Sequence, residues 1–113
     1  MIEFPRGVDR AVQYLKEKSY KIIDTDNNEN NALHIAAYDP EGALHLIQLQ
    51  LTEGHSVEKK MDRVEAEIEA MEYFSEHSDE PPCQVIFDTI SIMVCSDSKA
   101  LLRYHTNVLN EGE

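Results

Sequence analysis

The chain has 113 residues, of which 22 are acidic and 10 basic, so its formal charge is −12. This length suits a single domain spanning residues 1–113, and a hydrophobic share of 42% favours a folded protein over a disordered one. A protein that grips a nucleic-acid backbone normally presents a basic face, so the charge argues against nucleic acid as a partner. The first seven residues lack the basic head and apolar core of a signal peptide, and no apolar run approaches the roughly 20 residues of a membrane span. We therefore expect a cytoplasmic protein with no membrane partner.

The first third of the chain predicts a helix, a short strand and a long loop. Residues 7–18 repeat apolar side chains every three or four positions, from Val8 to Leu15, as a helix with one apolar face does. The apolar run at residues 20–23 is typical of a strand. The polar cluster at residues 24–31 offers many oxygens, but it lacks the glycine and the terminal glutamate of an EF-hand calcium loop. We interpret it as a solvated loop.

Residues 32–38 and 44–52 predict a hairpin. The sequence between them, Asp39-Pro40-Glu41-Gly42, has the residues that a β-turn prefers at its first, second and fourth positions. In the second strand the side chains alternate between two faces. One face carries Leu44, Leu46, Gln48 and Gln50, and the other carries His45, Ile47, Leu49 and Leu51. Because such a strand is mostly buried, its two neutral amides need hydrogen-bond partners, whereas His45 is interpreted as a packed or edge histidine.

Residues 57–76 predict a long helix with one apolar stripe that faces the core. The stripe consists of Val57, Met61, Val64, Ile68, Met71 and Phe74. The remaining faces are mainly acidic, which is typical either of a solvated face or of a surface that docks a partner. The candidate interaction surface comprises Glu65, Glu69, Glu72 and Glu76, together with the basic residues Lys59, Lys60 and Arg63 at the start of the helix.

The last third predicts two strands. Residues 84–95 have a nearly continuous apolar middle, as an interior strand does, and residues 100–105 form a shorter run. The expected order is therefore α-β-β-β-α-β-β. Interleaved helices and strands of this kind predict an α/β domain, in which helices flank both faces of a central mixed sheet.

Six segments of the chain, in this order, carry a family resemblance. They are Arg6-Gly7-Val8 with Tyr14-Leu15, Tyr20-Lys21-Ile22-Ile23, residues 32–37, residues 47–50, Phe87-Asp88 and Tyr104-His105-Thr106-Asn107. They resemble the opening Arg-Gly-Glu helix, the strands and the closing His-x-x-Asn of the YraN family of small bacterial proteins. That family belongs to the restriction-endonuclease-like, Holliday-junction-resolvase-like group, whose metal site is written PD-(D/E)XK.

The resemblance implies a restriction-endonuclease-like fold, but the catalytic positions have changed. The family pattern places Glu on the first helix, Asp on the second strand, and Glu and Lys on the third. Here those positions hold Val8, His34, Gln48 and Gln50, and none of them carries a carboxylate. Magnesium prefers hard anionic oxygens, and the missing lysine would have positioned water or the phosphate. The resemblance therefore implies a former active site that has lost its catalytic residues and needs no metal cofactor.

Two functions remain open at this point. The first is a catalytically inactive nuclease-fold protein that serves as a binding or regulatory module, through a protein partner. The alternative is a metal-dependent endonuclease for branched or single-stranded DNA, with Mg²⁺ or Mn²⁺ in an atypical or partner-completed site. A site of that kind would draw on His34, Gln48, Gln50 and Asp88. We interpret the first three of these residues as a satisfied polar network.

Overall fold

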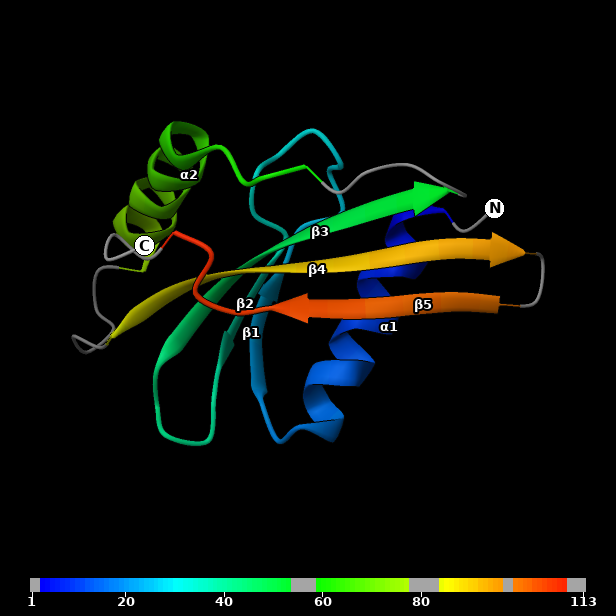
Figure 1. The fold of residues 1–113 in the computed structure, drawn as a ribbon. Coiled ribbons are helices and arrows are strands. Elements are labelled where there is room, and N and C mark those ends of the chain that lie inside the picture. Colours follow the sequence, from blue (N-terminus) through cyan, green and yellow to red (C-terminus); the bar gives the residue numbers. More distant parts are fainter. Residues whose placement is uncertain (1–2, 54–58, 78–83, 97–98, 110–113) are drawn as a thin grey trace.

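Five strands and two helices make up the computed structural model, which describes residues 3–53, 59–77, 84–96 and 99–109. The elements are α1 (Phe4–Glu17), β1 (Lys21–Thr25), β2 (Ile35–Tyr38), β3 (Leu44–Glu53), α2 (Arg63–Glu76), β4 (Val85–Ser96) and β5 (Lys99–His105). The strands form one sheet in the order β1-β2-β3-β4-β5, in which β3 and β4 are parallel and the other neighbours antiparallel (Figure 1). The predicted α/β class with a mixed sheet is confirmed.

Helix α1 covers one face of the sheet and carries half of the main core. It begins at Phe4, three residues before the prediction, because Pro5 is well suited to the first turn of a helix. Its buried residues Val8 and Leu15 pack against strand residues that include Ile47 and Ile90. In Figure 1, α1 lies behind β4 and β5. The expected apolar face of this helix is confirmed.

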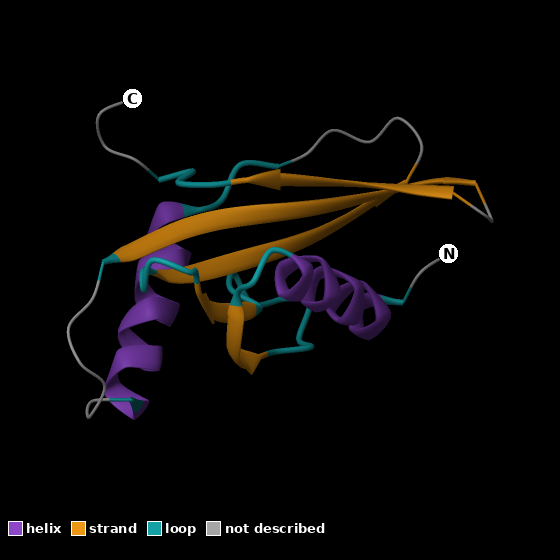
Figure 2. Cartoon of the chain, turned by 90° about the horizontal axis from the view of Figure 1, so that it is seen from below, coloured by secondary structure: helices purple, strands orange, loops and turns teal. Residues whose placement is uncertain are grey.

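The opposite face of the sheet packs against α2. Here Ala70 and Tyr73 of the helix contact a smaller core that contains Leu44, Leu46 and Phe87. The predicted alternation of β3 is therefore confirmed, since Leu44 and Leu46 lie in one core and Ile47 and its like-facing neighbours in the other. Figure 2 shows α1 and α2 apart from each other, at different ends of the sheet.

The prediction for the second helix is wrong in its start and in its orientation. The helix begins at Arg63, where the side chain of Asp62 accepts a hydrogen bond from the backbone N–H of Glu65. Val57, the predicted start, lies outside the described residues. The predicted buried stripe faces solvent instead, because the small side chains of Ala66 and Ala70 are the ones that approach the sheet. In the stripe, Met61 is buried, and the exposed members are Val64, Ile68, Met71 and Phe74.

The predicted hairpin forms, with a shorter first strand. In the turn, the N–H of Gly42 donates to the carbonyl of Asp39 at 3.0 Å, and Gly42 has a φ of +92°, which suits glycine. Strand β2 begins only at Ile35, and in the segment before it the backbone N–H groups of Ala32 and Leu33 donate to the carboxylate of Glu69 on α2. Thus His34 sits just before the strand. The interior position predicted for the fourth strand is confirmed, since β4 lies between β3 and β5.

Candidate functional site

Three of the four positions that the family resemblance singled out meet at one surface hollow. His34, Gln48 and Gln50 line a hollow of about 620 Å³, with Lys59 and Lys60 at its edge. The fourth position, Val8, does not line this hollow, because its side chain is buried in the core under α1. The sequence therefore placed three positions together correctly, while Val8 serves the core.

His34 is held as a neutral imidazole. Its Nδ1 accepts a hydrogen bond from the N–H of Leu49 at 2.9 Å, and its Nε2 lies 3.1 Å from the carbonyl oxygen of Asn28. Since Nδ1 must be an acceptor, Nε2 carries the proton and donates it. Burial lowers the pKa of His34 below its ordinary value, although the hydrogen bond to Asn28 opposes the shift. Both ring nitrogens are thus engaged by the backbone.

The two glutamines bind each other and the segment that precedes α2. The Oε1 of Gln50 accepts from the N–H of Lys59 at 3.0 Å, while its Nε2 donates to the carbonyl of Lys59 and, at 2.9 Å, to the Oε1 of Gln48. An amide supplies one acceptor and one donor group, and both are used here on a single backbone unit. Gln50 therefore ties the backbone of Lys59 to strand β3, and neither glutamine adds charge to the hollow.

A second buried histidine lies with two carboxylates in a cluster under α1. His45 places Nδ1 against Asp88 and Nε2 at 2.8 Å from Oδ2 of Asp39, so the ring donates to a carboxylate from both nitrogens. Asp88, which is 0% exposed, also accepts hydrogen bonds from the hydroxyls of Tyr104 and Thr106 and from the N–H of Asn107. The cluster joins the β2–β3 turn, two central strands and the chain that follows β5.

The titration of this cluster follows from its contacts. Burial alone would lower the pKa of His45, but the hydrogen bonds to Asp88 and Asp39 outweigh it and raise that pKa. For Tyr104, burial raises the pKa, and the hydrogen bonds to Asp88 and Tyr20 add to the shift. The structure thus assigns His45 as an imidazolium and Tyr104 as a neutral hydroxyl donor.

Sequence reasoning missed this cluster. His45 was interpreted as a packed or edge histidine and Asp88 only as a weak candidate metal ligand. A usable signal was present, because an aspartate inside the apolar run of an interior strand requires a cation or several donors beside it. What the sequence lacked was the register that pairs β3 with β4 and brings the two side chains together.

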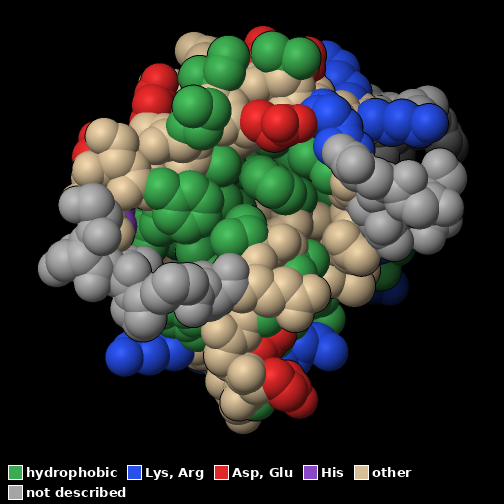
Figure 3. All heavy atoms as spheres, turned by 90° about the vertical axis from the view of Figure 1, so that its left-hand side faces the viewer, with side chains coloured by type: hydrophobic (Ala, Val, Ile, Leu, Met, Phe, Trp, Pro, Cys, Tyr) green, Lys and Arg blue, Asp and Glu red, His purple; other side chains and the backbone are tan. Residues whose placement is uncertain are grey.

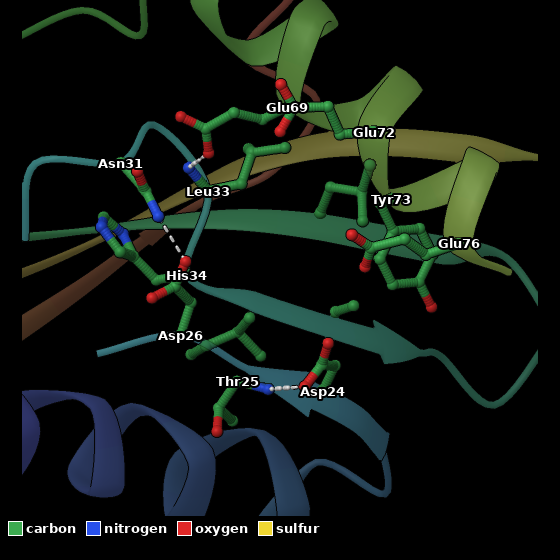
Figure 4. A pocket seen from close by; sticks show the side chains of 13 residues that line it. Asp24, Thr25, Asp26, Asn31, Leu33, His34, Glu69, Glu72, Tyr73 and Glu76 are labelled. Carbon is green, nitrogen blue, oxygen red and sulfur yellow. Dashed lines mark hydrogen bonds between the residues drawn. The ribbon is translucent and has the colours of Figure 1, made fainter. Parts of the chain in front are cut away.

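The candidate interaction surface on α2 does not form one continuous face. Glu69 turns inward and accepts hydrogen bonds from the backbone N–H groups of Ala32, at 2.6 Å, and Leu33, at 2.9 Å. Glu72 and Glu76 lie with Glu69 on a second hollow, of about 220 Å³ (Figure 4). That hollow also contains Asp24 and Asp26 of the β1 side, opposite the helix.

The other members of that surface lie around the start of α2. Glu65, Lys59 and Lys60 border the larger hollow. Arg63 donates to the carbonyl of Leu109 at 2.9 Å and lies 3.6 Å from a carboxylate oxygen of Glu67. The predicted surface is therefore divided between two hollows and one helix end.

An apolar surface that the sequence assigned to the core takes the outer side of α2. Val64 is 66% exposed, Ile68 51% and Met71 71%, and Phe74 is exposed beside them. Figure 3 shows the face of the molecule on which α2 lies, where hydrophobic side chains gather among acidic ones. Large apolar patches on a protein surface commonly mark sites of interaction.

No protein-family model matches the chain, and no curated protein matches it. Within the described residues, none of the helices is long and apolar enough to cross a membrane.

Proposed function

We propose that this chain is a catalytically inactive protein of restriction-endonuclease-like fold, related to the YraN family, which acts in the cytoplasm as a binding or regulatory module through a protein partner. The observation that carries the proposal is the state of the former active site. His34, Gln48 and Gln50 line one hollow, they are neutral, and their polar atoms already bind the chain itself.

The chemistry of these side chains disfavours metal-dependent hydrolysis. A divalent-metal nuclease needs carboxylates that hold Mg²⁺ or Mn²⁺, so that the metal activates water and offsets charge on the phosphate. The Oε1 of Gln50 already accepts from the N–H of Lys59, and it offers a metal no negative charge. Val8 would have to leave the core, where it is 2% exposed, before the first helix could supply anything to the hollow.

The arrangement of the sheet supports the fold assignment that goes with this proposal. The parallel pair β3 and β4 is connected through α2, and the helices cover opposite faces of the sheet. This is the α/β layout predicted from the order of helices and strands, and it is compatible with the fold that the family resemblance implies. The charge of −12 and the exposed apolar side of α2 favour a protein over a nucleic acid as the partner.

One observation favours the alternative, a metal-dependent endonuclease acting on branched or single-stranded DNA. The larger hollow is bordered by Lys59 and Lys60, and also by the carboxylates of Glu29, Asp62 and Glu65. Lysines beside a hollow suit a phosphate, and carboxylates suit a hard cation. In this alternative a partner chain completes the site.

Metal binding separates the two functions. Isothermal titration of the protein with Mn²⁺, paired with a cleavage assay on a four-way junction and on single-stranded DNA, should show neither specific binding nor cleavage. Specific Mn²⁺ binding, together with cleavage that the Gln50→Ala and Lys59→Ala variants abolish, would establish the endonuclease instead. Testing both variants separates activity of this chain from that of a contaminating nuclease.

A restoration variant tests the residue correspondences. The triple substitution His34→Asp, Gln48→Glu and Gln50→Lys returns the family's charged groups to the hollow and leaves Val8 in the core. We expect this variant to gain Mn²⁺ affinity over the unmodified protein. A variant that folds, as shown by circular dichroism, yet binds no Mn²⁺ would refute the assignment of these positions.

A further inference from the structure

Val64, Ile68 and Met71 form a continuous apolar line along α2, here called the outer ridge. They are spaced by four and three residues, which places them on one side of a helix, one per turn. Each residue advances the helix by about 100°, so the outer ridge points away from Ala66 and Ala70, which face the sheet. All three side chains are more than half exposed, so the outer ridge is free of contacts that would bury it within the described chain.

Carboxylates border the outer ridge on both sides. By the same helical rotation, Glu65 and Glu72 lie along one flank and Glu67 along the other. The cation nearest the second flank, Arg63, already pairs with Glu67 and donates to the carbonyl of Leu109. A segment laid along the outer ridge therefore meets apolar side chains at its centre and negative charge at its edges.

We infer that the outer ridge binds an amphipathic helix of a partner protein, whose own apolar stripe is flanked by lysine and arginine. This inference rests on the proposed function, and it specifies the chemistry of the partner. Recognition of one helix by another uses apolar anchors at spacings of three, four and seven residues, the spacing of the outer ridge. Basic flanks on the partner complement the carboxylates and also speed association with a chain of charge −12.

Charge argues against a second copy of the chain as the occupant. Two α2 helices paired antiparallel, with Ile68 of each copy beside Met71 of the other, would bring Glu65 of one copy close to Glu72 of the other on the same flank, twice in a symmetric dimer. Like charges in contact across a helix pair disfavour association, and two copies together would carry twice the charge of −12. A basic helix meets no such penalty.

Two synthetic helical peptides test the inference, with the same leucines in an apolar stripe but with lysine flanks in one and glutamate flanks in the other. Titration into the ¹⁵N-labelled full chain should give amide shifts confined to α2 with the lysine peptide, weaker binding as salt is raised, and no binding of the glutamate peptide. Ile68→Ser should weaken binding of the lysine peptide by about tenfold or more, as loss of a central anchor does. Leu101→Ser is the matched control, since Leu101 is 54% exposed on β5, and it should leave the affinity unchanged.

Three results would overturn the inference. Equal affinity for both peptides would remove the role of charge, and shifts outside α2 would place the site elsewhere. Binding of neither peptide would refute a helical partner, and dimerisation that Ile68→Ser abolishes would identify the occupant as a second copy. The Mn²⁺ titration and cleavage assay do not depend on the outer ridge, so the proposed loss of catalysis stands or falls separately.

Discussion

Two histidines in this fold are equally buried, yet they are held in opposite charge states. His34 is 2% exposed and His45 3%. His34 forms hydrogen bonds with backbone groups and is neutral, whereas His45 lies between two carboxylates and is protonated. The difference teaches that burial favours the neutral form of an imidazole unless charged partners beside it outweigh that effect. The imidazolium and carboxylates of the sheet lie in the core, where they contribute to stability. Its neutral amides line the hollow.

Removing the carboxylate of Asp88 should have the largest effect on this contrast. The Asp88→Ala variant leaves a buried imidazolium with one carboxylate partner and removes the carboxylate acceptor of the Tyr104 hydroxyl. Breaking one side of a buried ion pair costs about 3–5 kcal/mol, so the free energy of unfolding should fall by that amount. Urea denaturation followed by circular dichroism measures it.

The exposed Asp9, on the first turns of α1, supplies the control for that variant. Asp9→Ala should change the unfolding free energy by less than about 0.5 kcal/mol. If Asp88→Ala lowers the free energy of unfolding no more than Asp9→Ala does, then the buried cluster contributes nothing measurable to stability. The different surroundings of the two histidines would then have no energetic consequence.

On the neutral side, Gln50→Ala should cost less. It removes the contacts of the amide with Lys59, at a partly exposed site, so a loss of about 1–2 kcal/mol is expected. Hydrogen exchange gives a local readout, because the N–H of Lys59 loses its acceptor and should exchange faster. Gln48→Ala is the matched comparison, since it leaves the bonds between Gln50 and Lys59 in place. An unchanged exchange rate in Gln50→Ala would contradict the described contact.

Changes of pH should have the smallest effects on the free energy of unfolding, and these effects have opposite signs for the two histidines. The pKa of His45 is raised from 6.5, so its contribution to stability is fully present below about pH 6.5 and is lost as the pH rises through the folded-state pKa. The pKa of His34 is lowered, so its contribution is present above about pH 6.5 and is lost as the pH falls. NMR titration of the ring C–H signals should place the two midpoints on opposite sides of 6.5.

A variant identifies which histidine causes each loss. His45→Gln should remove the loss of stability at alkaline pH and keep the loss at acid pH, relative to the unmodified chain. Midpoints of both histidines on the same side of 6.5 would mean that their surroundings are not as different as the structure assigns.

Local patterns in the sequence predicted much of the fold, and pairings distant in sequence account for most of what was missed. The alternation of β3 and the turn at Asp39 are set by neighbouring residues, and both form as predicted. The apolar stripe of α2 was detected correctly, but periodicity does not say which side of a helix faces a sheet. In α2 the buried side is the one with the small side chains of Ala66 and Ala70.

The same distinction applies to the candidate site, where one group of residues was predicted and another was missed. The meeting of His34, Gln48 and Gln50 at one hollow was predicted from the family resemblance, which carries information about the third dimension. The pairing of His45 with Asp88 depends on the parallel register of β3 and β4, in which Ile47 lies opposite Asp88. Because two strands far apart in the chain set that register, no local pattern indicates it.

The parallel register of β3 and β4 has a consequence for the order in which the molecule is made. Leu44 pairs with Val85, so the whole of α2 must be synthesised before β3 gains its second neighbour. On the ribosome, α1 and the hairpin emerge first, and His45 then lacks the carboxylate of Asp88 that keeps it protonated. Contacts between distant segments form slowly, which makes the pairing of β4 with β3 a late step of folding. Protonation of His45 therefore accompanies the arrival of β4, and its ring signal would report when a nascent chain has paired β3 with β4.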